Sequence, residues 1–243
     1  MRRNQKLIKN MLFLVLFFGL LFGLTSVSRA EEKEEGMYFS ILGVQNYIEG
    51  DFDGESAGKF ENSSTICTFP EIDSGKGFGI LIGGYRDKIA GEIYYSCSKH
   101  ETSFTYAVDI DDDGFYDGLY DYIKDGEVQL IGVNIKYHFV NLFSENISFY
   151  IQSGIFYPII TLEQAAYNEN NSNDKADVTY TGYGLDAGIG ALIHLHPKLA
   201  ISAQAVYRYL RIEQAEAFGE EREPTKSTYG NGRSYTIGLI YYF

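Results

Sequence analysis

The chain has 243 residues and carries 20 Lys and Arg against 33 Asp and Glu, a formal net charge of −13 at pH 7. An acidic surface repels nucleic acid and anionic lipid headgroups, so we expect no nucleic-acid partner and regard divalent cations as natural ligands. Tyr (21), Phe (17) and Gly (26) are frequent and Pro is rare (4), a mixture typical of strands joined by tight turns, with aromatic belts.

The N-terminal part has the organisation of a signal peptide. A basic segment precedes an apolar run over 11–24, and Ser28 and Ala30 occupy the −3 and −1 positions of a cleavage site. The run is short for a spanning helix, which disfavours an uncleaved anchor. Cleavage removes five basic and no acidic residues, so 15 basic and 33 acidic residues remain, a formal net charge of −18. We expect a signal peptide at 1–30 and one exported domain at 31–243.

Eight segments of the exported part alternate apolar and polar residues with period 2, which predicts strands. In chain order they span about 37–48, 75–86, 89–106, 127–139, 147–158, 178–195, 199–213 and 234–243. The facing of the first is ambiguous. The connections alternate between long and short. The long ones, at about 49–74, 107–126, 161–177 and 214–233, suit extracellular loops, and the short ones suit periplasmic turns.

The last segment, S-Y-T-I-G-L-I-Y-Y-F, has an apolar face made by alternate residues and ends on an aromatic side chain. It resembles the C-terminal signature of bacterial outer-membrane β-barrels, which implies that Phe243, Tyr241 and Leu239 form a signal read by the barrel-insertion machinery. The alternation over nearly all of the exported part is similar to that of the small eight-stranded outer-membrane proteins of the OmpA/OmpX type. The resemblance implies a monomer in the cell outer membrane of a Gram-negative-type bacterium, in contact with lipid and lipopolysaccharide.

The fold expected from these patterns is all-β: an eight-stranded antiparallel transmembrane β-barrel with long extracellular loops. A soluble periplasmic lipocalin-like barrel also has eight alternating strands. Its polar face would be exposed to water and rich in Lys and Glu. The polar face here is mostly Gly, Ser, Thr and Gln, which better suits a crowded interior.

Four charged residues fall on the inward face of the predicted strands. They are Glu92, Lys136, Asp186 and Arg208. Isolated charges would have a large desolvation cost, so we expect Glu92 to pair with Lys136 and Asp186 with Arg208. An eight-stranded barrel is just wide enough for side chains to fill, and these pairs would plug its lumen. The alternative function for the four residues is a gate for ions or a small solute.

The segment D-I-D-D-D-G-F-Y-D resembles part of a calcium-binding loop. Four carboxylates fall at positions 1, 3, 5 and 9 of that pattern: Asp109, Asp111, Asp113 and Asp117. Position 12, which normally supplies a bidentate Glu, is Tyr120. We expect an incomplete, weak Ca²⁺ site or a solvated acidic loop, and no required cofactor.

Two further groups of residues leave alternatives open. Cys67 and Cys97 are the two cysteines of the chain, and export would permit either a disulfide or two unpaired thiols. The segment K-H-E-T-S brings together His100, Glu101 and Ser103, as in a nucleophilic site, but His100 and Ser103 point to opposite faces of an extended strand. We therefore expect no enzyme activity.

The expected function is a structural or surface-interaction role through acidic extracellular loops. A narrow porin-like channel for a small solute is one alternative, and a soluble lipocalin-like binder is another.

Overall fold

The structure is a computed structural model that describes residues 35–52, 56–59, 65–69, 71–108, 118–144, 146–168, 171–222 and 228–243. Within these ranges, the side chains of 56–59, 65–69, 104–108, 118–122, 140–144, 167–168, 171–174 and 222 are not described. The expected signal peptide and its cleavage site lie outside the described residues.

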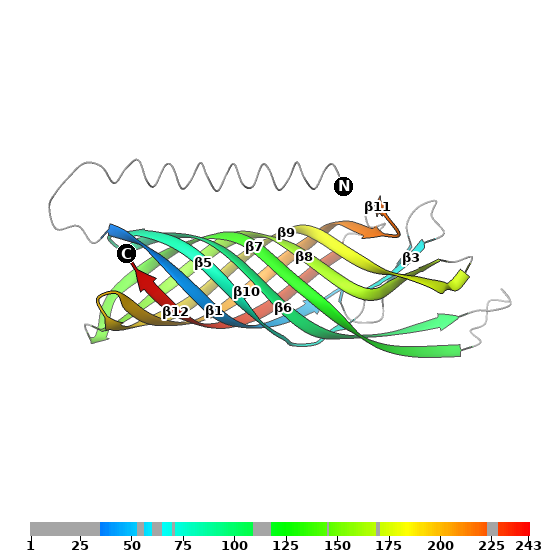
Figure 1. Cartoon of the computed structure of the whole chain (residues 1–243), viewed down its shortest axis with the longest axis horizontal. Helices are drawn as coiled ribbons and strands as arrows, with labels where there is room; N and C mark the ends of the chain where they lie inside the picture. Colours follow the sequence, from blue (N-terminus) through cyan, green and yellow to red (C-terminus); the bar gives the residue numbers. More distant parts are fainter. Residues whose placement is uncertain are drawn as a thin grey trace.

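Eight long antiparallel strands form a closed barrel (Figure 1). They are β1 (Glu35–Gly50), β5 (Gly75–Arg86), β6 (Ile89–Val108), β7 (Gly118–Ser144), β8 (Ile147–Asn168), β9 (Asn171–His196), β10 (Leu199–Ala217) and β12 (Thr228–Tyr242). Each pairs with its neighbour in this order, and the ring closes because β12 pairs with both β10 and β1. The expected eight-stranded antiparallel barrel is confirmed.

Four short strands accompany the barrel strands at one end. They are β2 (Ser56–Lys59), β3 (Thr65–Phe69), β4 (Glu71–Ile72) and β11 (Glu220–Arg222). β2 and β3 pair with each other, β3 adds to β8, β4 to β6 and β11 to β10. We call this the loop end. The opposite end, the turn end, has the short connections from β5 to β6, from β7 to β8 and from β9 to β10, together with Glu35 and Phe243.

Side chains alternate between the outside and the lumen as expected along most of each barrel strand, with register shifts between Leu162 and Ala166 and between Ile212 and Gln214. On β12, Tyr235, Ile237 and Leu239 are exposed, whereas Ser234, Thr236 and Ile240 are buried. In the other predicted strands too, the apolar residues of the alternating pattern face outward. The facing of β1 is now assigned: Tyr38, Leu42 and Val44 point into the lumen.

The strands at the loop end are longer than expected, and this corrects the predicted loops, most clearly those at 107–126 and 161–177. Much of 107–126 belongs to β6 and β7, which pair as far as Val108 and Gly118, and most of 161–177 belongs to β8 and β9. Pairing between β7 and β8 begins only at Gly126 and Leu162, so two hairpins project separately beyond the barrel wall (Figure 1). A period-2 pattern arises where one face of a strand contacts lipid and the other faces the lumen. Beyond the bilayer this demand is absent, so paired strands can form without the pattern.

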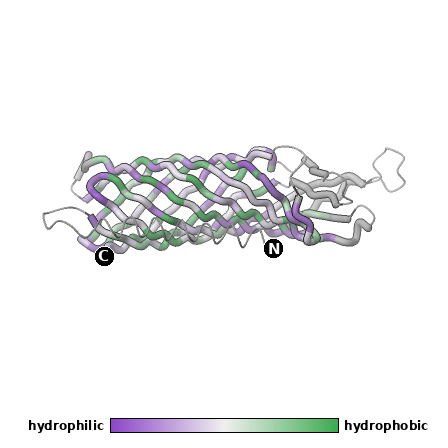
Figure 2. Tube along the Cα trace, turned by 90° about the horizontal axis from the view of Figure 1, so that it is seen from above, coloured by the Kyte–Doolittle hydropathy of each residue, from purple (hydrophilic) through white to green (hydrophobic). Residues whose placement is uncertain are grey.

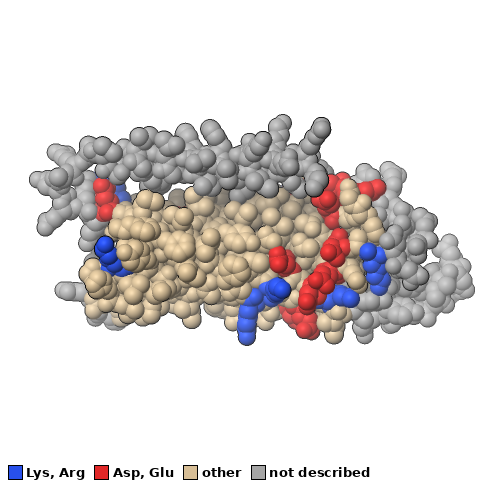
Figure 3. All heavy atoms as spheres, in the orientation of Figure 1, with Lys and Arg blue, Asp and Glu red and all other residues tan. Residues whose placement is uncertain are grey.

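The outer surface carries an apolar band. Ile82, Ile135, Ile189 and Ile237 are each more than half exposed on different strands. Charged side chains gather towards the loop end, with a few at the turn end and a band without them in between (Figure 3). Green apolar segments alternate with paler and purple ones along the barrel strands (Figure 2).

Aromatic pairs flank this band. Tyr47 and Tyr235 lie at its loop-end margin, and Tyr241 and Phe243 at its turn-end margin, with ring centroids 6.0 and 5.6 Å apart. Within the described part of the chain, no helix is long and apolar enough to cross a membrane.

An apolar surface of this extent needs a lipid cover, because soluble monomers rarely expose one. A closed barrel with an apolar band between aromatic belts is the architecture of bacterial outer-membrane proteins. The lipocalin-like alternative is therefore wrong: the apolar side chains cover the outside.

Candidate functional site

A buried ion pair occupies the turn-end half of the lumen. Lys136 Nζ lies 2.7 Å from Glu92 Oε1, and both side chains are almost fully buried. Tyr38 donates its hydroxyl hydrogen to the same oxygen at 2.6 Å. Lys136 Nζ also lies 4.4 Å from the centroid of the Tyr150 ring. The structure therefore confirms the pairing of Glu92 with Lys136 and adds two tyrosines that the charge pattern alone did not indicate.

The second expected ion pair, between Asp186 and Arg208, is wrong as a direct contact. The two residues are cross-strand partners on β9 and β10. However, Arg208 Nη1 donates to Asn46 Oδ1 of β1 at 2.9 Å, and Asp186 Oδ2 accepts from the Tyr94 hydroxyl of β6 at 3.2 Å. The side chains diverge because each finds a neutral partner on another strand, while their opposite charges remain neighbours in the lumen.

Hydrogen bonds continue from Arg208 towards the loop end. Asn46 Nδ2 donates to Ser98 Oγ at 2.9 Å, and Ser98 Oγ lies 2.9 Å from His100 Nε2. His100 Nδ1 lies 2.7 Å from the main-chain oxygen of Asp73. A Cβ atom on Gly75 would lie 2.3 Å from the His100 ring, so glycine leaves the space that the ring occupies.

The loop end of the lumen is filled by apolar side chains. We call this group the apolar cap: Phe52, Ile72, Val128, Ile160, Leu162, Val178, Tyr180, Leu210 and Ile212, all at most 3% exposed. Phe52 follows β1 and packs edge-on against Tyr180, with ring centroids 6.0 Å apart. The cap lies on the side where the sheet leaves the apolar band.

Gly50 and Asp51 connect the end of β1 to Phe52 in the cap. Gly50 has φ +101°, a left-handed conformation that suits glycine. Asp51 N donates to the Tyr229 main-chain oxygen at 2.9 Å, and Tyr229 N donates to Asp51 Oδ2 at 2.8 Å. These two bonds hold the segment before Phe52 against β12.

Between the ion pair and the cap, several buried polar atoms have no hydrogen-bond partner among the described residues. Ser96 Oγ, Asn134 Oδ1, Gln152 Oε1 and Thr236 Oγ1 line a void of about 10 Å³ beside Arg208. A void this small holds about one water molecule. The middle of the lumen is therefore polar and narrow.

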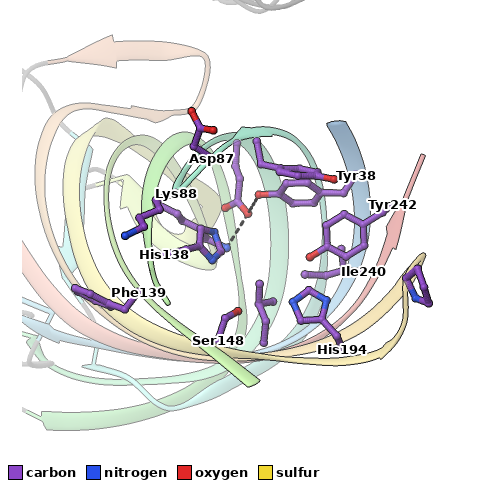
Figure 4. A pocket seen from close by; sticks show the side chains of 14 residues that line it. Tyr38, Asp87, Lys88, His138, Phe139, Ser148, His194, Ile240 and Tyr242 are labelled. Carbon is purple, nitrogen blue, oxygen red and sulfur yellow. Dashed lines mark hydrogen bonds and ion pairs between the residues drawn. The ribbon is translucent and has the colours of Figure 1, made fainter. Parts of the chain in front are cut away.

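At the turn end the lumen opens into a cavity of about 400 Å³ (Figure 4). Its floor is formed by Glu92 and Lys136. Its walls and rim carry the side chains of Tyr38, Tyr85, Asp87, Lys88, His138, Phe139, Ser148, Leu192, His194, Pro197, Ile240 and Tyr242. No sequence pattern indicated this cavity, because it depends on which side chains fill the turn end.

The other candidate sites have different outcomes. Asp109, Asp111, Asp113 and Asp117 lie outside the described residues, so the calcium loop stays a prediction. Among the described residues, no group of three or more His, Cys, Asp or Glu side chains is arranged to hold a metal.

The disulfide alternative is not formed, because Cys97 is a free thiol on the outer face of β6. The side chain of Cys67 is not described. Its strand, β3, pairs with β8, where Cys67 is opposite Ala166.

His100 and Ser103 do not meet, as expected. His100 is instead 3% exposed and bonded to Ser98 inside the lumen. Ser98 is also buried, so this pair has no access for a substrate.

The terminal residues Phe243, Tyr241 and Leu239 all face outward, with exposed fractions of 69, 45 and 52%. This is the facing that their expected role as an insertion signal needs, and the role itself stays a prediction.

No family model and no curated protein match the chain. Solved structures of similar architecture include Neisserial surface protein A, at 12% identity and a TM-score of 0.48, covering 88% of this chain and 100% of that one. The attachment invasion locus protein Ail of Yersinia pestis has 15% identity and a TM-score of 0.43, with 88% and 100% covered. The outer membrane protease OmpT of Escherichia coli has 8% identity and a TM-score of 0.42, with 90% and 99% covered. These identities are too low to transfer an activity to this chain.

Proposed function

We propose that the protein is a non-conducting outer-membrane barrel that acts at the cell surface through the part of its sheet beyond the bilayer. The apolar cap is the observation that carries this proposal. A lumen that ends in close-packed apolar side chains presents a dewetted barrier to ions and polar solutes. The Glu92–Lys136 pair is a second obstruction below it.

The projecting hairpins support the surface role. β6 with β7, and β8 with β9, continue as paired strands past the start of β7–β8 pairing. At their base, outward charges such as Glu101 and Asp125 are exposed. Paired strands hold such a surface in a defined shape, which suits recognition of a partner better than an unstructured loop does.

The first test separates surface action from transport. Purified protein in planar bilayers should give no steady conductance, and Gln152→Leu in the lumen should leave this unchanged. Cells that display a chain in which a short Gly-Ser turn replaces 104–122 should attach less to a matrix-coated surface, whereas cells with Gln152→Leu should attach as the parent does. Large, steady single-channel currents from the parent protein would contradict the proposal.

A narrow channel is the second candidate, and the turn-end cavity with the void above it favours it. Conduction would require the apolar cap to open. Currents that appear in the parent protein only under voltage, and that become constant in Phe52→Ala, would favour the channel.

A further inference from the structure

The turn-end cavity has the dimensions of a ligand site, and the closed-barrel proposal gives it no role. Its volume of about 400 Å³ lies in the range of small-molecule sites, roughly 300–1,000 Å³. It opens at the end opposite the apolar cap. Any ligand would therefore enter from the side of the tight turns, which is the periplasmic side in barrels of this type.

The charges around the cavity balance. Asp87 and Glu92 contribute two negative charges, and Lys88 and Lys136 contribute two positive ones. Because Glu92 is already paired with Lys136, the lysine would repel a cationic ligand and the carboxylate would repel an anionic one. The electrostatics therefore favour a neutral ligand.

The walls combine aromatic faces with neutral hydrogen-bonding groups. Tyr38, Tyr85 and Tyr242 form a cluster with ring centroids 5.6 to 6.3 Å apart. His138 and His194 are arranged around the opening, with Ser148 beside them (Figure 4). Aromatic rings with polar tips offer an apolar surface and a hydrogen bond together.

The floor retains hydrogen-bonding capacity. Tyr38 and Lys136 both bind Glu92 Oε1, and Oε2 has no partner among the described residues, although Glu92 is only 4% exposed. Buried polar atoms in folded proteins are nearly always satisfied. A bound hydroxyl group, with a small rotation of the carboxylate, would supply the missing donor.

From these features we infer that the turn-end cavity is a binding site for a small neutral saccharide. The sugar ring would lie against the tyrosine cluster, and its hydroxyl groups would bind the two histidines, Ser148 and the Glu92 carboxylate. The inference does not rest on the proposed surface function, which involves the opposite end of the barrel.

The test uses ligand-observed saturation-transfer NMR on the refolded full barrel in lauryldimethylamine oxide micelles, since sugar-based detergents would compete. Glucose and N-acetylglucosamine are the neutral probes, and glucosamine and glucuronate are the cationic and anionic ones. We expect saturation transfer to the neutral sugars at millimolar concentration and much less to the charged ones. No transfer to either neutral sugar, or stronger transfer to a charged one, would overturn the inference.

A matched pair of variants locates the site. His194→Trp fills the cavity, whereas Leu195→Trp changes the next residue, which is 57% exposed on the lipid face. Transfer should be lost in the first and kept in the second. Because mobility on an unboiled gel reports closed barrels, it verifies folding of both. Should His194→Trp fail to fold, His138→Ala, which removes a hydrogen-bonding ring, must weaken transfer. Undiminished transfer in a folded His194→Trp or His138→Ala barrel would contradict the site.

Discussion

The two ends of the lumen are built from different chemistry although the same strands line both. Towards the turn end, charged and hydroxyl-bearing side chains share the lumen with apolar ones such as Leu192 and Ile240, and tyrosines contact a buried ion pair beside an open cavity. Towards the loop end the apolar cap predominates, although Ser98, His100 and Thr102 are also buried there. The polar half resists collapse because its groups need partners, whereas the apolar cap packs like the core of a soluble domain.

This difference suits the separate roles that we propose for the two ends. In the proposed function, the cap would seal the barrel where the sheet leaves the bilayer. The polar half stabilises the lumen inside the bilayer and leaves space for water or a ligand at the turn end. Substitutions in the two halves should therefore lower the free energy of unfolding by different amounts.

The largest expected effect comes from breaking the ion pair on one side. Lys136→Met leaves Glu92 buried and unpaired, which should lower the free energy of unfolding by about 3–5 kcal/mol. Glu92→Leu combined with Lys136→Met should recover most of the loss, because no buried charge remains. Urea unfolding followed by circular dichroism in micelles gives the values, with exposed Lys99→Met as the control. A double variant no better than the single one would show that the pair contributes more than mutual neutralisation.

Truncation in the apolar cap should have a slightly smaller effect. Phe52→Ala removes a side chain that is 2% exposed and packed on Tyr180, so a loss of about 3 kcal/mol is expected from lost burial and the cavity left behind. Hydrogen exchange should increase near Tyr180 and remain unchanged at the Glu92–Lys136 pair. The exposed Phe218→Ala serves as the control. Faster exchange throughout the barrel would mean that the two halves unfold as one unit.

The smallest expected losses in the free energy of unfolding concern the partners of Arg208 and Asp186. Asn46→Ala removes the acceptor of Arg208, and a hydrogen bond to a charged group contributes about 1.5–3 kcal/mol. Asp186→Asn keeps an oxygen for the Tyr94 hydroxyl and breaks no direct ion pair, so a loss below about 1 kcal/mol is expected. The same urea unfolding measures both. If Asp186→Asn lowered the free energy of unfolding more than Asn46→Ala, the result would support the originally expected direct ion pair between Asp186 and Arg208.

Part of this molecule could be predicted from its sequence. The period-2 pattern indicated eight strands and the facing of seven, because lipid outside and a crowded lumen inside impose opposite demands on alternate residues. Inward charges on neighbouring strands indicated the Glu92–Lys136 pair for the same reason. The pattern was uninformative where both faces of a strand meet similar surroundings. In β1, for example, apolar residues lie on both sides.

Other features depend on distances that cross the barrel. Arg208 reaches Asn46 and Tyr94 reaches Asp186 across strands far apart in the chain, so no local spacing could reveal that these contacts replace the expected ion pair. Phe52 lies in a segment that the sequence described only as a polar loop, and its burial in the cap follows from the Gly50 turn and the Asp51–Tyr229 bonds. The sequence by itself therefore determined which residues face the lumen. The tertiary structure decided which of them meet, because closing the sheet brings opposite walls together.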